Sequence, residues 1–122
     1  MTNDLRVGVI GVGMMGADHA HRIVDRVSGA TLVAVSDPDT ARASTLADQF
    51  TGVRLIADPL DLIADEGVDA VIIASPGFVH EEQLLACIEH GKHALCEKPL
   101  TMDTESSLRV FEPEAKSGRP LI

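Results

Sequence analysis

Three glycines, Gly11, Gly13 and Gly16, lie in the stretch GVGMMG, directly after an apolar β-branched run and at the start of a helical pattern. In that setting each glycine has its own task. The first makes a tight turn, the second lets a diphosphate approach the backbone, and the third lets helix and strand pack closely. Free N–H groups at the start of the helix, at Met14 and Met15, attract an anion. The stretch therefore predicts a site for the diphosphate of a dinucleotide.

A carboxylate follows at a suitable distance. Asp37 ends the second apolar run, 37 − 16 = 21 residues after Gly16, where an acid can bind the hydroxyls of the adenosine ribose. Alternatively, Asp37 caps the next helix, and both roles can hold together. An acid here repels a 2′-phosphate, so we expect NAD as the cofactor in preference to NADP. Arg42 would soften that preference if it were close, but we expect it on a solvated helix face.

The stretch HALCEKPLT places Lys98 between Glu97 and Pro99 at the end of another apolar run. Proline fixes the backbone there and removes a donor, which favours a functional lysine over a surface residue that happens to follow a strand. An ammonium group orients a substrate hydroxyl and stabilises negative charge developing on its oxygen. Glu97 either holds the lysine or is solvated. We also expect the Lys98–Pro99 peptide bond to be cis.

Strand-like apolar runs and helical patterns alternate along the chain, which is typical of a parallel sheet covered on both faces. We therefore predict a doubly wound α/β fold of the NAD(P)-binding Rossmann type, forming one domain over residues 1–122. Pro113 is expected to kink or end the last helix, and the segment RPLI could begin a sixth strand. The predicted strands cover 5–11, 30–37, 53–58, 69–75 and 93–98, and the predicted helices cover about 15–27, 40–50, 59–67, 78–91 and 103–118.

The predicted topology brings distant segments together. In the strand order 3-2-1-4-5-6, the carboxyl ends of strands one, four and five line one crevice, where ligands bind in such sheets. Those ends carry residues 11–14, 75–80 and 97–99. Lys98 is therefore expected to point toward the nicotinamide end of the cofactor. His80 either contacts cofactor or substrate, or is simply a polar residue at a helix start.

Composition excludes several classes of partner. Hydrophobic residues make up 45% of the 122 residues and aromatic residues only 2%, so the core must be aliphatic. The formal charge of −9 argues against nucleic acid or an anionic membrane as a partner. No apolar segment is long enough to span a bilayer, and we expect a cytoplasmic protein. The histidines have no metal-ligand spacing, and both cysteines are expected to be small buried hydrophobic residues.

Four segments together resemble a known family: VGVIGVGMMGADHAHRI, VAVSDPD, VIIASPGFVHEE and ALCEKPLT. They are similar to the N-terminal domain of the glucose–fructose oxidoreductase/inositol dehydrogenase/rhizopine-catabolism (Gfo/Idh/MocA) family, and GADH and CEKPLT look most like its inositol 2-dehydrogenases. The resemblance implies NAD(P)-dependent oxidation of a hydroxyl of a sugar or cyclic polyol to a ketone. It implies that Lys98 hydrogen-bonds the reacting substrate beside the nicotinamide. Ser75, Pro76 and Glu97 would lie against the cofactor, with His80 near the nicotinamide-side rim.

Members of this family continue into a second α/β domain that holds the substrate and supplies an aspartate and a histidine, and this sequence contains no such domain. We therefore hold two hypotheses. In the first, the chain is the cofactor-binding part of an NAD-dependent polyol or sugar dehydrogenase, inactive alone and forming a homo-oligomer. In the second, it is a stand-alone dinucleotide-binding module with a sensing or scaffolding role.

Overall fold

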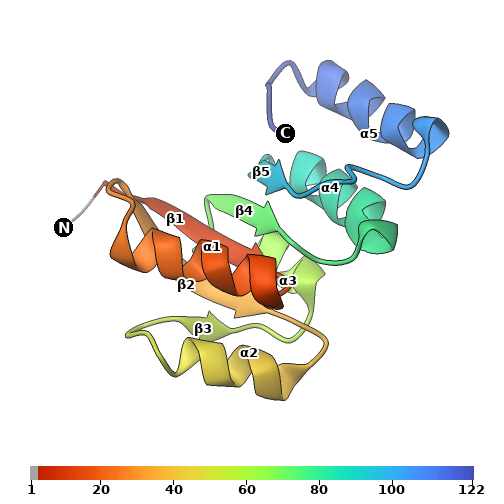
Figure 1. Ribbon diagram of the computed structural model, residues 1–122. Coiled ribbons are helices and arrows are strands. Elements are labelled where there is room, and N and C mark those ends of the chain that lie inside the picture. Colours follow the sequence, from red (N-terminus) through yellow and green to blue (C-terminus); the bar gives the residue numbers. More distant parts are fainter. Residues whose placement is uncertain (1–2) are drawn as a thin grey trace.

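The computed structural model describes residues 3–122 and centres on a parallel sheet of five strands in the order β3-β2-β1-β4-β5 (Figure 1). The strands are β1 (Leu5–Ile10), β2 (Ala30–Ser36), β3 (Arg54–Leu55), β4 (Ala70–Ile73) and β5 (His93–Cys96). The helices are α1 (Met14–Asp25), α2 (Thr40–Ala47), α3 (Pro59–Ala64), α4 (His80–Glu89) and α5 (Thr104–Ser117), with a 3-10 turn at Gly77–Val79.

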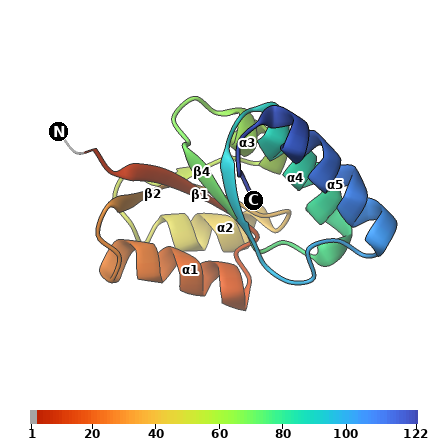
Figure 2. The same ribbon diagram turned by 90° about the horizontal axis from the view of Figure 1, so that it is seen from above.

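Helices cover both faces of the sheet, as the alternating pattern predicted. Helices α1 and α2 pack on one face, whereas α3 and α4 pack on the other with α5 against α4 (Figures 1 and 2). Two aliphatic clusters fill the two interfaces. The first includes Val9 and Ala20, and the second includes Ile63 and Leu84. The doubly wound α/β fold is thus confirmed, and its two cores hold the carboxyl ends of the strands along one edge.

The third strand is shorter than the predicted range 53–58. Only Arg54 and Leu55 pair with β2, and both are exposed at the sheet edge. One further bond, from the N–H of Ile56 to the oxygen of Val35 at 3.0 Å, continues the contact. The chain must then turn, because Asp58 already caps α3 by accepting from the N–H of Leu60.

Pro113 was expected to kink or end the last helix, and the prediction that it would end the helix is wrong. Helix α5 continues past Pro113 to Ser117 and stops at Gly118, whose φ of 72° is left-handed. A proline leaves the carbonyl four residues earlier without its helical bond. That residue is Arg109, which is exposed, so solvent can replace the missing partner.

The segment RPLI does not form a sixth strand in the structure. A single backbone bond, from the N–H of Ala94 to the oxygen of Leu121 at 2.8 Å, joins it to the edge strand β5. The carboxylate of Glu114 accepts the N–H groups of Leu121 and Ile122 at 2.9 and 2.7 Å. These side-chain bonds take the place of strand pairing. Within residues 3–122, no helix has the length and apolar character needed to cross a membrane.

Candidate functional site

Two of the three loop glycines are required by the fold itself. Gly11 has a φ of +85°, and a Cβ there would come within 2.6 Å of the backbone of Ser75. A Cβ on Gly16 would lie 1.6 Å from the oxygen of Gly11. No larger residue could occupy either position without moving the backbone. These two glycines therefore make the turn and the close contact of helix with strand that the motif predicted.

Gly13 is not explained by packing. Its φ is −67°, which any residue can adopt, and an added Cβ would meet nothing closer than Arg42 Nη1 at 3.9 Å. Gly13 lines a cleft at the carboxyl ends of the strands. The absent side chain therefore leaves room for something outside the chain, as a diphosphate close to the backbone requires.

The start of α1 also favours an anion. Asp39, Asp58 and Asp103 cap α2, α3 and α5 through their side chains. Gly13 provides no such bond to α1. Helix α4 also lacks a side-chain cap but has Glu81 and Glu82 in its first turn, whereas the first turn of α1 has no acidic residue. Its first N–H groups thus remain for a ligand, and they add to the positive end of the helix dipole. Met14 and Met15 are 88% and 48% exposed and contribute through these N–H groups.

Asp37 follows the last residue of β2 and is 3% exposed. Its Oδ2 accepts the N–H of Val12 at 2.8 Å, and its Oδ1 accepts the N–H of Asp39 at 2.8 Å. Arg42 Nη2 donates to both oxygens, at 3.1 and 3.0 Å. Burial raises the pKa of Asp37, but the two N–H groups and the guanidinium outweigh it, and the net pKa is lowered. The carboxylate is therefore ionised at neutral pH.

The alternative role of Asp37 as a helix cap falls to another residue, since Asp39 accepts from the N–H of Arg42 and is the N-cap of α2. The expectation for Arg42 also needs correction. Its side chain is 53% exposed, as expected on a solvated helix face, but its guanidinium is also close enough to donate to Asp37, which was not expected. The guanidinium can reach it because residue 42 lies only one turn into α2.

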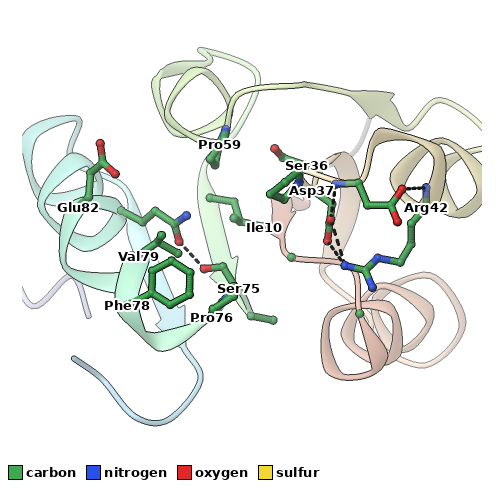
Figure 3. A pocket seen from close by; sticks show the side chains of 16 residues that line it. Ile10, Ser36, Asp37, Arg42, Pro59, Ser75, Pro76, Phe78, Val79 and Glu82 are labelled. Atoms are coloured by element: carbon green, nitrogen blue, oxygen red, sulfur yellow. Dashed lines mark hydrogen bonds and ion pairs between the residues drawn. The ribbon is translucent and has the colours of Figure 1, made fainter. Parts of the chain in front are cut away.

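A cleft of about 680 Å³ joins these groups and falls in the size range of small-molecule sites. Figure 3 shows Asp37 and Arg42 on one side and Ser75, Pro76 and Phe78 on the other. The cleft thus brings together five of the predicted residues: Gly11, Gly13, Asp37, Ser75 and Pro76. Ser75 Oγ donates to Gln83 Oε1 at 2.6 Å, which fixes the hydroxyl at the cleft wall.

His80 does not line this cleft. It is 1% exposed, and its two ring nitrogens contact main-chain oxygens on different segments. Nδ1 lies 2.7 Å from the oxygen of Pro99, and Nε2 lies 2.7 Å from the oxygen of Ser75. The ring therefore ties the turn after β4 to the turn after β5. In this structure His80 positions the turns around the predicted nicotinamide end.

The turn that carries Lys98 packs beside the same strand ends. The N–H of Glu97 donates to the oxygen of Ile73 at 2.9 Å, and Pro99 Cγ lies 3.1 Å from where a Cβ on Gly77 would be. The Lys98–Pro99 bond is cis, as predicted. Lys98 itself is exposed. Glu97 neither holds the lysine nor is merely solvated, because its Oε1 lies 3.1 Å from Nε2 of His19 on α1.

Three residues near these turns were not predicted: His19, Arg42 as a partner of Asp37, and Gln83. A helical signal was present for His19, because it lies three residues after Gly16 and so shares its inward side of α1. The contact of Gln83 with Ser75 had no such signal, because it depends on how α4 is rotated. Both cysteines are free, and burial raises the pKa of Cys87 to about 12 and that of Cys96 to about 11. Cys87 is the small buried residue that was expected, whereas Cys96 is only partly buried.

Comparison with known proteins agrees with this geometry. Residues 5–122 match the GFO_IDH_MocA model, described as the oxidoreductase family, NAD-binding Rossmann fold. The chain belongs to this family. The recognised resemblance is thus confirmed, and the chain is an NAD-binding Rossmann domain of the Gfo/Idh/MocA oxidoreductases.

Two similar proteins and one similar solved structure are inositol dehydrogenases. The inositol 2-dehydrogenase of Rhodococcus jostii is 54% identical over 121 residues, which are 99% of this chain and 33% of that protein. Inositol 2-dehydrogenase 1 of Mycolicibacterium vanbaalenii is 57% identical over 120 residues, covering 98% and 35%. The myo-inositol dehydrogenase of Lactobacillus casei, solved with NAD(H) and myo-inositol, superposes with a TM-score of 0.92 at 32% identity, covering 97% and 35%. The chain therefore spans about a third of the length of these relatives.

Proposed function

We propose that this chain is the cofactor-binding part of an NAD-dependent oxidoreductase that oxidises a hydroxyl of a cyclic polyol or sugar to a ketone. Myo-inositol is the first substrate to test, because inositol dehydrogenases are among the proteins that this chain resembles. The observation that carries the proposal is the open position at Gly13 in the same cleft as Asp37. A diphosphate over Gly13 and a ribose on Asp37 would occupy that cleft together.

The family relation and the neighbouring turns support a role for Lys98 in the reaction. The cofactor, when bound, accepts a hydride from the carbinol carbon. Lys98 would then donate a hydrogen bond to the substrate oxygen and stabilise its developing negative charge. His80 and Glu97 would fix the turn on both sides of Lys98, through Ser75 and His19 respectively. The acid/base that removes the hydroxyl proton would come from a second domain. The relatives, of which this chain covers about a third, are long enough to contain one.

Cofactor binding is the first test of this proposal. Titration of the 122-residue chain with NADH, followed by nicotinamide fluorescence, should show saturable binding; the chain contains no Trp or Tyr to interfere. Gly13→Val should abolish it, because the side chain would fill the diphosphate position. Ala115→Val, on the exposed side of α5, is the matched control. Unchanged affinity in Gly13→Val would remove the main support for the site.

Turnover is tested in a chimera. This chain would replace the matching third of the Rhodococcus jostii relative, with which it is 54% identical. The proposal expects NADH formation with myo-inositol or a related cyclic polyol or sugar. A folded chimera that binds NAD but oxidises no polyol or sugar in a panel would contradict the proposed reaction while leaving the cofactor site intact.

A further inference from the structure

The carboxylate of Asp37 is fully occupied in the free protein. An ionised carboxylate offers about four acceptor positions. Four contacts fill them: the N–H groups of Val12 and Asp39, one on each oxygen, and Arg42 Nη2 within 3.1 Å of both. A ribose that binds Asp37 must therefore replace one of these donors or share its place.

Only one of the three donors can leave readily. The N–H of Val12 belongs to the buried turn that follows β1, since Val12 is 3% exposed, and losing that bond would leave a buried donor unpaired. The N–H of Asp39 belongs to the backbone turn that begins α2. Arg42 has a long side chain that is 53% exposed, so its guanidinium can move into water at little cost.

We infer that Arg42 holds the ribose-binding carboxylate in the free protein and sets how strongly the site prefers NAD over NADP. This inference rests on the proposed cofactor site. With NAD, the ribose hydroxyls take the Asp37 positions that Arg42 vacates, so the guanidinium is a competitor inside the chain. With NADP, the 2′-phosphate arrives beside Asp37, and the displaced guanidinium is the nearby cation that can pair with it. The same residue thus opposes one cofactor and supports the other.

Position 42 also lies over the diphosphate loop. Its Nη1 is the nearest atom, at 3.9 Å, to a Cβ built on Gly13, and Arg42 lines the cleft together with Asp37 and Gly13 (Figure 3). The guanidinium therefore stays at the cleft once it leaves Asp37, where the 2′-phosphate that distinguishes NADP would bind. An arginine elsewhere on a helix surface has neither the carboxylate nor the cleft.

The test compares binding of NAD and NADP to the 122-residue chain by calorimetry, for the unmodified protein and for Arg42→Met. The variant should bind NAD about two- to fivefold more tightly, because an exposed ion pair no longer competes. It should bind NADP about tenfold more weakly, because the phosphate loses a charge-assisted partner. Arg42→Lys should recover most of the NADP affinity, since a cation is restored.

Arg22→Met is the matched control. Arg22 is also exposed and ion-paired, to Asp18 within α1, so the variant changes net charge equally without touching the cleft. A ratio of NAD to NADP affinity that Arg42→Met leaves within twofold of the Arg22→Met ratio would overturn the inference while the cofactor site stands. Failure of the unmodified chain to bind either cofactor would instead remove both the inference and the proposed function beneath it.

Discussion

His19 on α1 and Glu97 before Lys98 meet at 3.1 Å between Nε2 and Oε1, although 78 residues separate them in sequence. The pair is partly buried, with side chains 17% and 30% exposed. It joins the helix that begins at the diphosphate loop to the turn that carries the lysine. The two ends of the expected cofactor site are thereby held in one arrangement.

This contact predicts a measurable coupling. In a double-mutant cycle, His19→Ala and Glu97→Ala should together destabilise the chain less than the sum of the single changes, by about 0.5–1 kcal/mol. Chemical denaturation at constant pH measures the three values. The same cycle with Arg22→Ala and Asp18→Ala, an exposed pair within α1, provides a comparison. Strict additivity at His19 and Glu97 would mean that the pair contributes nothing to the arrangement.

Lys98→Met should lower kcat/KM of the chimera by about 100-fold or more, because a donor to the developing oxyanion is lost. The affinity for NAD should change little, since Lys98 is exposed and lies outside the cleft that holds Asp37. Lys116→Met, on the exposed last turn of α5, controls for loss of a surface charge. Turnover within a few-fold of the unmodified chimera would return Lys98 to the class of surface residues.

Acid should weaken the fold partly through Asp69. The Arg6 side chain, together with its N–H, lowers the pKa of Asp69 from 3.8 to about 2. Since the unfolded chain takes up the proton first, this stabilisation is complete above pH 3.8 and is lost as pH falls toward 2. Stability of Asp69→Asn, measured by urea unfolding, should fall less over that window than that of the unmodified chain. Asp25→Asn, at an exposed position of α1, is the control, and its stability should fall over this window as much as that of the unmodified chain.

Both thiols should resist modification in the native state. Burial raises the pKa of Cys87 to about 12 and that of Cys96 to about 11, so almost no thiolate exists near pH 8. The thiol reagent dithiobis(nitrobenzoic acid) should react with neither cysteine until denaturant is added. Mass spectrometry of iodoacetamide-treated protein identifies any modified site. Fast labelling of Cys87 without denaturant would indicate that the interface of α4 with the sheet opens readily.

The chain alone should bind NAD, produce no NADH from polyols, and self-associate. A shallow groove beside β5 is lined by exposed apolar residues, among them Leu5, Val27 and Leu95 at 45%, 48% and 57% exposure. Surface of this kind tends to pair with another copy. Light scattering should give a mass above that of one chain, and Leu95→Lys should lower it. NADH formation by the purified chain, or a monomer at all concentrations, would contradict the respective half.

Local patterns predicted the parts of the fold that local forces determine. Gly11 and Gly16 could be placed from their spacing, because the left-handed φ of Gly11 and the contact of Gly16 with the oxygen of Gly11 are local features. The close approach of Gly11 to the backbone of Ser75 is a tertiary contact that reinforces the same requirement. The third strand was predicted too long. Asp58 caps α3 and so stops the strand from continuing, and the apolar pattern of residues 53–58 does not show this. The passage of α5 through Pro113 depends on the exposure of Arg109, which is a property of the packed helix.

The site was predicted less completely than the fold, for a physical reason. Asp37 was found because its distance from the glycine loop is set by one helix and one strand. Arg42, Gln83 and His19 act through partners on other segments, and their contacts depend on the rotation of α2, α4 and α1. The role of Glu97 was left between two alternatives for the same reason, since its actual partner, His19, lies on a helix far away in sequence.

The bond between Asp37 and the N–H of Val12 has a consequence for the divergence and redesign of cofactor preference. That acid supports the first βα turn as well as lining the proposed cofactor site, so replacing it would disturb the loop that both dinucleotides would need. If evolution or protein engineering changed the cofactor preference by replacing Asp37, the same substitution would also remove the acceptor of the Val12 N–H. Position 42 carries no such obligation. It is therefore the more accessible starting point, and single substitutions there can be explored before the acid itself is exchanged.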